Sequence, residues 1–186
     1  MTVVAPHSRL RAWGEAEFPA WKALHQDPDV AHWLGGVWSP QVSRRNFERA
    51  AGHVAEHGWG VWAVLDAGGQ VVGAAGLQAT REGLPFSGVE AAWRLRAEAQ
   101  GRGLISTVMP GILADGFDRL PHDELLAYTA RTNERSQAVM RRLGFLRDET
   151  RDFDHPVLAL GHPLRSHVMY RLSRSPEGRL QEGQDR

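Results

Sequence analysis

Gln100-Gly101-Arg102-Gly103 is the stretch of this sequence whose residue types are best suited to binding a ligand. Two glycines allow consecutive backbone N–H groups to turn towards one point, and Arg102 adds a fixed positive charge. The preceding residues alternate as in a β-strand, and the amphipathic run that follows predicts a helix beginning at Leu104. Such a loop can hold phosphate through its N–H donors and the helix dipole. A tight turn without a ligand is the alternative.

A carboxylate, Glu90, interrupts the apolar strand of residues 89–95 that leads into this loop. Its position next to a ligand-binding loop suits a general base. The alternative is a glutamate on the solvent-facing side of the strand. His155 is a rival base, because imidazole titrates near neutral pH without help from its surroundings. A loop histidine that bonds to its own backbone is the simpler interpretation of His155.

Aspartate and histidine residues near the C-terminus raise the question of a metal site. The candidates are Asp152, Asp154, His155, His162 and His167. Their spacing fits no standard pattern of helical or loop ligands, so we expect no metal. The sequence contains no cysteine, which excludes disulfides, a thiol nucleophile and a Cys-ligated metal.

The composition is that of a globular protein with one domain, which we expect to span residues 7–173 of the 186, followed by a disordered polar tail at 174–186. Hydrophobic residues make up 42% and charged residues 24% of the chain, and the formal net charge is zero. Neutral charge without a dense basic helix argues against nucleic acid or a membrane surface as a partner. No apolar run reaches membrane-spanning length and no signal peptide is evident, so we expect a cytoplasmic protein.

Hydrophobic periodicity predicts the elements that position these residues. Strands are expected at residues 10–13, 59–65, 70–77, 89–95, 125–129, 145–146 and 167–172. Helices are expected at residues 15–25, 30–34, 39–54, 104–120 and 133–143. Pro110 lies past the first turn of its helix, so a kink or local break is expected near Ser106. Residues 148–165 form a long connection that could act as a lid. This order predicts a mixed α/β fold around one central sheet.

Two blocks of the sequence resemble one known family. Residues 100–105, Gln-Gly-Arg-Gly-Leu-Ile, resemble the Arg/Gln-x-x-Gly-x-Gly/Ala signature of the Gcn5-related N-acetyltransferases. Asn133-x-x-Ser136, followed by Leu-Gly-Phe at residues 143–145, resembles a second marker of that family. The resemblance covers nearly the whole chain and implies a mostly antiparallel, twisted central sheet flanked by helices. Further blocks at residues 33–35, 153–156 and 161–165 resemble the branch grouped with the Rim-type ribosomal-protein N-terminal acetyltransferases.

The resemblance implies an N-acetyltransferase that moves the acetyl group of acetyl-CoA to a primary amine by direct attack in a ternary complex. The acceptor would be a protein N-terminal α-amine or a small-molecule amine, and the enzyme a monomer or homodimer. A non-catalytic acyl-CoA-binding module of the same fold is the alternative. The residues expected to bind the cofactor are Trp93, Arg94, Leu95, Gln100, Gly101, Arg102, Gly103, Leu104, Ile105, Ser106, Asn133 and Ser136. Ile105 stands where the family usually has a small residue, which would narrow the approach of the backbone to the phosphates.

The resemblance also suggests catalytic roles. Related enzymes often carry a base at the strand position of Glu90. Many relatives use a tyrosine acid seven residues after the asparagine, but that position is Met140 here and cannot donate a proton. We therefore assign the acid role near the cofactor sulfur to Ser136, with helix capping as the alternative for Ser136 and for Asn133. The expected acceptor wall consists of Trp33, Trp38, Phe86 and His155, although tryptophans in such places are often core residues.

Overall fold

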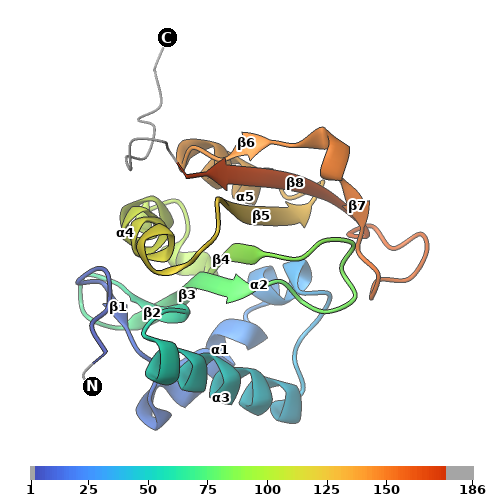
Figure 1. Cartoon of the computed structure of the whole chain (residues 1–186). Helices are drawn as coiled ribbons and strands as arrows, with labels where there is room; N and C mark the ends of the chain where they lie inside the picture. Colours follow the sequence, from blue (N-terminus) through green and yellow to red (C-terminus); the bar gives the residue numbers. More distant parts are fainter. Residues whose placement is uncertain (1–2, 175–186) are drawn as a thin grey trace. The chain divides into compact units, whose positions relative to one another are not determined.

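The computed structural model describes residues 3–174, which divide into two compact units (Figure 1). The first unit is built from the residues up to Leu77 and from Ala92–Asp115, and the second from Gln78–Ala91 and from Gly116 onwards. Apart from Arg174, the predicted tail lies outside the described residues. Within residues 3–174, no helix is long and apolar enough to cross a membrane.

The strands of the first unit follow one another in the order β1-β2-β3-β4. They are β1 (Leu10–Arg11), β2 (Val61–Leu65), β3 (Val71–Ala79) and β4 (Val89–Leu95), with the end of β3 and the start of β4 assigned to the second unit. The β1–β2 and β2–β3 pairs are antiparallel, as the hairpin turn at Gly68-Gly69 predicts. A Cβ atom at Gly73 would lie only 2.5 Å from the carbonyl oxygen of Arg94. Glycine therefore allows β3 to lie close to the last part of β4.

An aromatic core holds the N-terminal helices of the first unit together. These are η1 (Glu15–Glu17), α1 (Phe18–Gln26), α2 (Pro28–Trp33) and α3 (Pro40–His57), and Figure 1 shows α1 and α3 side by side in blue and teal. Trp13 and Trp21 meet edge-on at 4.9 Å between ring centroids, and Phe47 packs 5.9 Å from Trp21. All three rings are buried. Edge-to-face contacts of this kind add stability beyond their buried area.

Helix α4 (Leu104–Arg119) follows the short η2 turn (Ala97–Ala99) and runs without a break through Pro110. The predicted break near Ser106 is therefore absent. A proline inside a helix costs about 3 kcal/mol or more, but apolar residues on both sides of it are buried. These are Leu104, Ile105, Val108, Met109, Ile112 and Leu113. Their burial outweighs the hydrogen bond that Pro110 cannot make.

The second unit is organised around β8 (Ser166–Ser173), which pairs with three other strands. Its other elements are β5 (Glu124–Ala130), α5 (Glu134–Arg142), β6 (Leu146–Arg147), η3 (Glu149–Arg151) and β7 (Phe153–Asp154). All pairs with β8 are antiparallel, whereas β4 and β5 pair in parallel with Glu90 opposite Leu126. The expectation of a mixed α/β fold with mostly antiparallel strands is confirmed.

The connection at residues 148–165 contains more regular structure than the sequence suggests, because it includes η3 and β7. Arg165 closes its second half: the guanidinium donates to Asp154 Oδ2 at 3.2 Å, and the Arg165 carbonyl accepts from the His155 N–H at 2.8 Å. Val157 and Leu160, between these anchors, are 78% and 90% exposed. The tip between His155 and Arg165 therefore carries the exposed apolar side chains of the segment.

Candidate functional site

The glycine-rich loop of the first unit adopts the conformation its residues suggest. Gly101 and Gly103 have φ angles of 72° and 73°, in the left-handed region that favours glycine. The Gly103 carbonyl accepts the Thr107 N–H at 3.0 Å, so α4 begins directly after the loop. The N–H groups in the first turn of a helix have no acceptor within that helix. Residues 101–103 are exposed, so this N-terminus is open to an anionic ligand.

Ile105 does not obstruct this loop. Its side chain is 6% exposed and that of Leu104 is 7% exposed, so both lie in the protein interior. Ile105, where the sequence departs from the family signature, therefore packs in the protein interior. The exposed residues of the loop are Gly101, Arg102 and Gly103.

The start of the loop is fixed by the junction between α1 and α2. Asp27 Oδ2 accepts the backbone N–H of Ala97 at 3.1 Å, while its Oδ1 caps α2 by accepting the Asp29 N–H at 2.9 Å. Gln100 Nε2 donates to the Leu95 carbonyl at 3.0 Å. The segment that leads from β4 into the loop is thus held by side chains on both sides.

Arg94 on β4 is positioned by a buried histidine that the sequence does not single out. His25 Nδ1 lies 2.8 Å from the Trp21 carbonyl, which can only accept, so this nitrogen carries the proton and Nε2 accepts from Arg94 at 3.1 Å. Burial, and then the charge of Arg94, lower the pKa of His25 to about 3. The ring therefore stays neutral and keeps the guanidinium in place at ordinary pH.

The two tryptophans of the expected acceptor wall differ in burial, and both belong to the first unit. Trp38 stacks on His25 with 4.0 Å between ring centroids and packs against the aromatic core. Trp33, at the end of α2, is 38% exposed. The core interpretation therefore describes Trp38, and Trp33 keeps an exposed ring surface that a ligand can reach.

Glu90 is a buried carboxylate of the second unit, with only 8% of its surface exposed. The Tyr128 hydroxyl donates to Glu90 Oε2 at 2.7 Å, and Gln78 Nε2 donates to the same oxygen at 3.1 Å. The solvent-facing alternative for Glu90 is therefore wrong. Hydrogen bonds to a carboxylate oxygen stabilise its ionised form, which is the form that accepts a proton.

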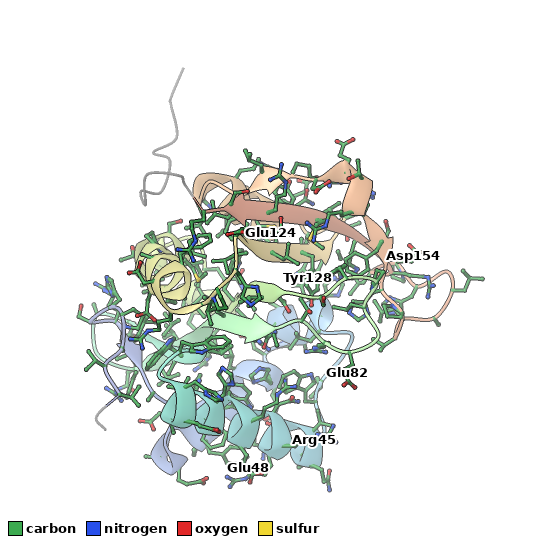
Figure 2. All side chains as sticks on the ribbon, in the orientation of Figure 1. Arg45, Glu48, Glu82, Glu124, Tyr128 and Asp154 are labelled. Carbon is green, nitrogen blue, oxygen red and sulfur yellow. The ribbon has the colours of Figure 1, made fainter. Side chains whose placement is uncertain are left out.

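Tyr128 of β5 is a site residue that sequence reasoning missed (it is labelled in Figure 2). Burial, and then the charge of Glu90 and its hydrogen bond, raise the pKa of the Tyr128 phenol far above its usual value. The phenol therefore keeps its proton and remains a donor. In the sequence Tyr128 looks like any aromatic residue of a strand. Its contact with Glu90 depends on the parallel pairing of β4 and β5, in which Glu90 lies opposite Leu126, and the sequence does not indicate that pairing.

A cluster of rings packs against the Tyr128 ring and includes two predicted acceptor residues. Phe86 lies 5.5 Å from the Tyr128 ring and 4.9 Å from the Phe153 ring, measured between centroids. Phe153 contacts His167 at 5.2 Å, and His167 contacts His155 at 4.9 Å. The second unit thus brings Phe86 and His155 into the same cluster as Tyr128, the donor to Glu90.

His155 is neutral in this cluster. Burial, and then the charges of His167 and Arg81, lower its pKa to about 4. Its Nδ1 atom is buried and makes no hydrogen bond to any residue that the structure describes. A histidine with so low a pKa is a weak base. By contrast, its buried, unpartnered nitrogen can bind a polar group of a ligand.

Asn133, not Ser136, caps α5. Its Oδ1 accepts the Ser136 N–H at 3.1 Å, and its Nδ2 donates to Thr129 Oγ1 at 3.0 Å. The capping alternative is therefore right for Asn133 and wrong for the Ser136 side chain. Ser136 is half-buried in the first turn of α5, and Met140, one turn later, is 2% exposed.

The aspartates and histidines near the C-terminus make other contacts. Asp152 accepts hydrogen bonds from Arg131 at 2.8 Å, from Arg147, and from the Met169 N–H at 3.1 Å. Burial alone would raise the pKa of Asp152, but these hydrogen bonds together lower it. Over residues 3–174, no group of three or more histidine and acidic side chains is placed to hold a metal ion.

Comparisons with known proteins agree with the family resemblance seen in the sequence. The family model described as an acetyltransferase (GNAT) domain matches residues 8–146. An acetyltransferase from Agrobacterium tumefaciens is 23% identical, with a TM-score of 0.68 over 88% of each chain. A ribosomal-protein-alanine N-acetyltransferase from Brucella melitensis is 22% identical, with a TM-score of 0.68 over 88% of this chain and 98% of that chain.

A third solved structure is the RimL ribosomal L7/L12 α-N-protein acetyltransferase in complex with coenzyme A. It is 17% identical, with a TM-score of 0.71 over 92% of this chain and 98% of that chain. These likenesses concern the fold, and the family model covers most of the sequence. The chain therefore belongs to the Gcn5-related N-acetyltransferase (GNAT) family.

Proposed function

We propose that this protein transfers the acetyl group of acetyl-CoA to a primary amine, by direct attack of the amine on the thioester while both are bound. The observation that carries the proposal is the Glu90 carboxylate, buried in the second unit and held by two neutral donors, Tyr128 and Gln78. A module that only bound the cofactor would have no use for such a group.

The first unit would hold the cofactor. Its pyrophosphate would bind the backbone N–H groups of Gly101–Gly103 and of the first turn of α4, with Arg102 adding charge. The backbone of residues 93–95 would bind the pantetheine arm. Support comes from the loop geometry and from the coenzyme A bound to the RimL structure.

In the proposed reaction the amine nitrogen attacks the thioester carbonyl carbon, and Glu90 accepts the proton that the nitrogen loses. The C–S bond then breaks, and the sulfur leaves as a thiolate or takes a proton from the Ser136 hydroxyl, which regains a proton from water. Tyr128 and Gln78 act through Glu90, because their hydrogen bonds keep its carboxylate ionised in a buried place. His155 would contact the acceptor through its unpartnered Nδ1 atom.

The acceptor is a protein N-terminal α-amine or a small-molecule amine. The blocks at residues 33–35, 153–156 and 161–165 favour the Rim-type branch, and therefore an N-terminal α-amine. Exposed Trp33 of the first unit offers apolar surface for such an acceptor. Phe86 and His155 of the second unit are the other proposed acceptor contacts.

The test is release of free thiol from acetyl-CoA in the presence of amine classes: peptides with free N-termini, amino acids and small drug-like amines. The proposal predicts amine-dependent release by the wild type, greatest with one class. A His155→Asn variant should keep acetyl-CoA binding and change mainly the apparent affinity for the acceptor. Tight coenzyme A binding without release in any class would favour the non-catalytic module.

A further inference from the structure

A pocket of about 620 Å³ lies in the first unit beside the glycine-rich loop. It is lined by residues of and just before β1, by η1 and the start of α1, by the β2–β3 hairpin, and by the segment between β4 and α4. Its charged lining residues are Arg9, Arg11, Arg96, Arg102, Glu17, Asp66 and Glu98. A cavity of this size can hold a small organic ligand, and four arginines against three carboxylates give it a net positive lining.

The three carboxylates of the pocket already have partners. These contacts are Arg11 to Glu17 at 3.4 Å, Arg96 to Glu98 at 2.9 Å, and the Gly68 and Gln70 N–H groups to Asp66 Oδ1 at 2.9 Å each. Two of the four arginines are therefore used within the lining itself. The remaining two, Arg9 and Arg102, determine what else the pocket can bind.

Arg9 and Arg102 make no side-chain hydrogen bond or ion pair with any residue between Val3 and Arg174. Arg9 is half-buried, and its backbone is fixed because its N–H donates to His7 Nδ1 at 3.0 Å and its carbonyl accepts the Leu65 N–H at 2.9 Å. Removing a cation from water without a partner is unfavourable. A half-buried guanidinium that faces a cavity is therefore suited to an anion.

We propose that this pocket binds a phosphate monoester group between Arg9 and Arg102. A phosphate dianion matches two guanidinium charges, and the planar fork of arginine binds phosphate oxygens in pairs. Arg102 also belongs to the loop proposed to hold a pyrophosphate, so the two anion sites adjoin. The group could be the ribose phosphate of coenzyme A, in which case the inference rests on the proposed function, or part of a separate phosphorylated molecule.

The experiment compares coenzyme A with 3′-dephospho-coenzyme A by calorimetric titration. The variants are Arg9→Gln, which keeps the backbone contacts, and Arg45→Gln as the control. Arg45 is an exposed arginine of α3 outside the pocket (Figure 2). A second arm measures thermal stabilisation by inorganic phosphate, both without cofactor and with dephospho-coenzyme A present.

If the cofactor supplies the phosphate, Arg9→Gln weakens coenzyme A binding about fivefold to tenfold, less at high salt, and leaves dephospho-coenzyme A binding unchanged. If a separate molecule supplies it, Arg9→Gln affects neither cofactor but abolishes the stabilisation by inorganic phosphate. Equal behaviour of Arg9→Gln and wild type in both arms overturns the proposal. Failure of the wild type to bind either cofactor contradicts the proposed function instead, and the phosphate arm still tests the pocket.

Discussion

Tyr128→Phe removes one hydroxyl next to Glu90 and keeps the ring that packs on Phe86 and Phe153. The lost 2.7 Å hydrogen bond ends on a buried carboxylate, and bonds to charged groups contribute about 1.5–3 kcal/mol. At 1.36 kcal/mol per pH unit, losing this energy would move the acidic limb of the pH–rate profile by about one to two pH units. Gln78 still donates at 3.1 Å, so we expect the lower value.

Because the hydrogen bond favours the ionised carboxylate, its loss makes Glu90 easier to protonate. The acidic limb of the pH–rate profile should therefore move to higher pH by about one unit. The rate on the alkaline side of the limb and the affinity for acetyl-CoA should change little. The assay is thiol release at saturating acetyl-CoA, measured across the pH range.

The chain has one other tyrosine, which serves as the matched control. The Tyr170 hydroxyl donates to Gln137 Oε1 at 3.3 Å and accepts from Arg141 at 3.2 Å, whereas the Tyr128 hydroxyl donates to Glu90. Tyr170→Phe should leave the limb in place. An unmoved limb in Tyr128→Phe, or an equal shift in both variants, would refute the role assigned to Tyr128.

Replacing both Gly101 and Gly103 by valine should abolish thermal stabilisation by coenzyme A; stabilisation equal to the wild type would contradict the loop assignment. Ser136→Ala should lower the turnover rate more than the affinity for acetyl-CoA, whereas equal losses would make Ser136 a cofactor contact only. His155→Asn should raise the apparent KM for the amine with little effect on kcat; a large kcat loss would make His155 the base. The pKa of His25 is lowered from 6.5 to about 3, so the unfolded state binds the proton first and stability falls as pH drops below 6.5. The fall in the free energy of unfolding amounts to at most about 5 kcal/mol, and in urea unfolding His25→Gln should make it smaller. The same pH dependence in His25→Gln and the wild type would contradict the assignment to His25.

The parts of the site that depend on local sequence could be predicted. The conformation of the glycine-rich loop follows from two glycines between a strand and a helix, and the observed φ angles of Gly101 and Gly103 agree with it. Burial of Glu90 is consistent with its place in an apolar strand. Asn133 lies where a cap is expected, directly before an amphipathic helix. The loop conformation and the Asn133 cap are set by neighbours within a few residues, whereas the burial of Glu90 also depends on Tyr128.

The contacts that arise from strand pairing and helix packing could not be predicted. Tyr128 reaches Glu90 across a parallel strand pair, 38 residues away in the sequence. His25 reaches Arg94 over 69 residues, and no local pattern indicates that its neutral ring holds a guanidinium. The uninterrupted helix around Pro110 has the same origin, since burial of the flanking apolar residues outweighs a local preference for a break.

Glu90→Gln tests the central claim most directly. Glutamine keeps the shape of the side chain and can still accept from Tyr128, but it has no basicity. Thiol release should be measured against pH at saturating acetyl-CoA and amine, with coenzyme A binding as the control. The account predicts a loss of about two to four orders of magnitude in rate, a flattened acidic limb and unchanged coenzyme A binding. A rate within a few-fold of the wild type, with the acidic limb intact, would contradict it.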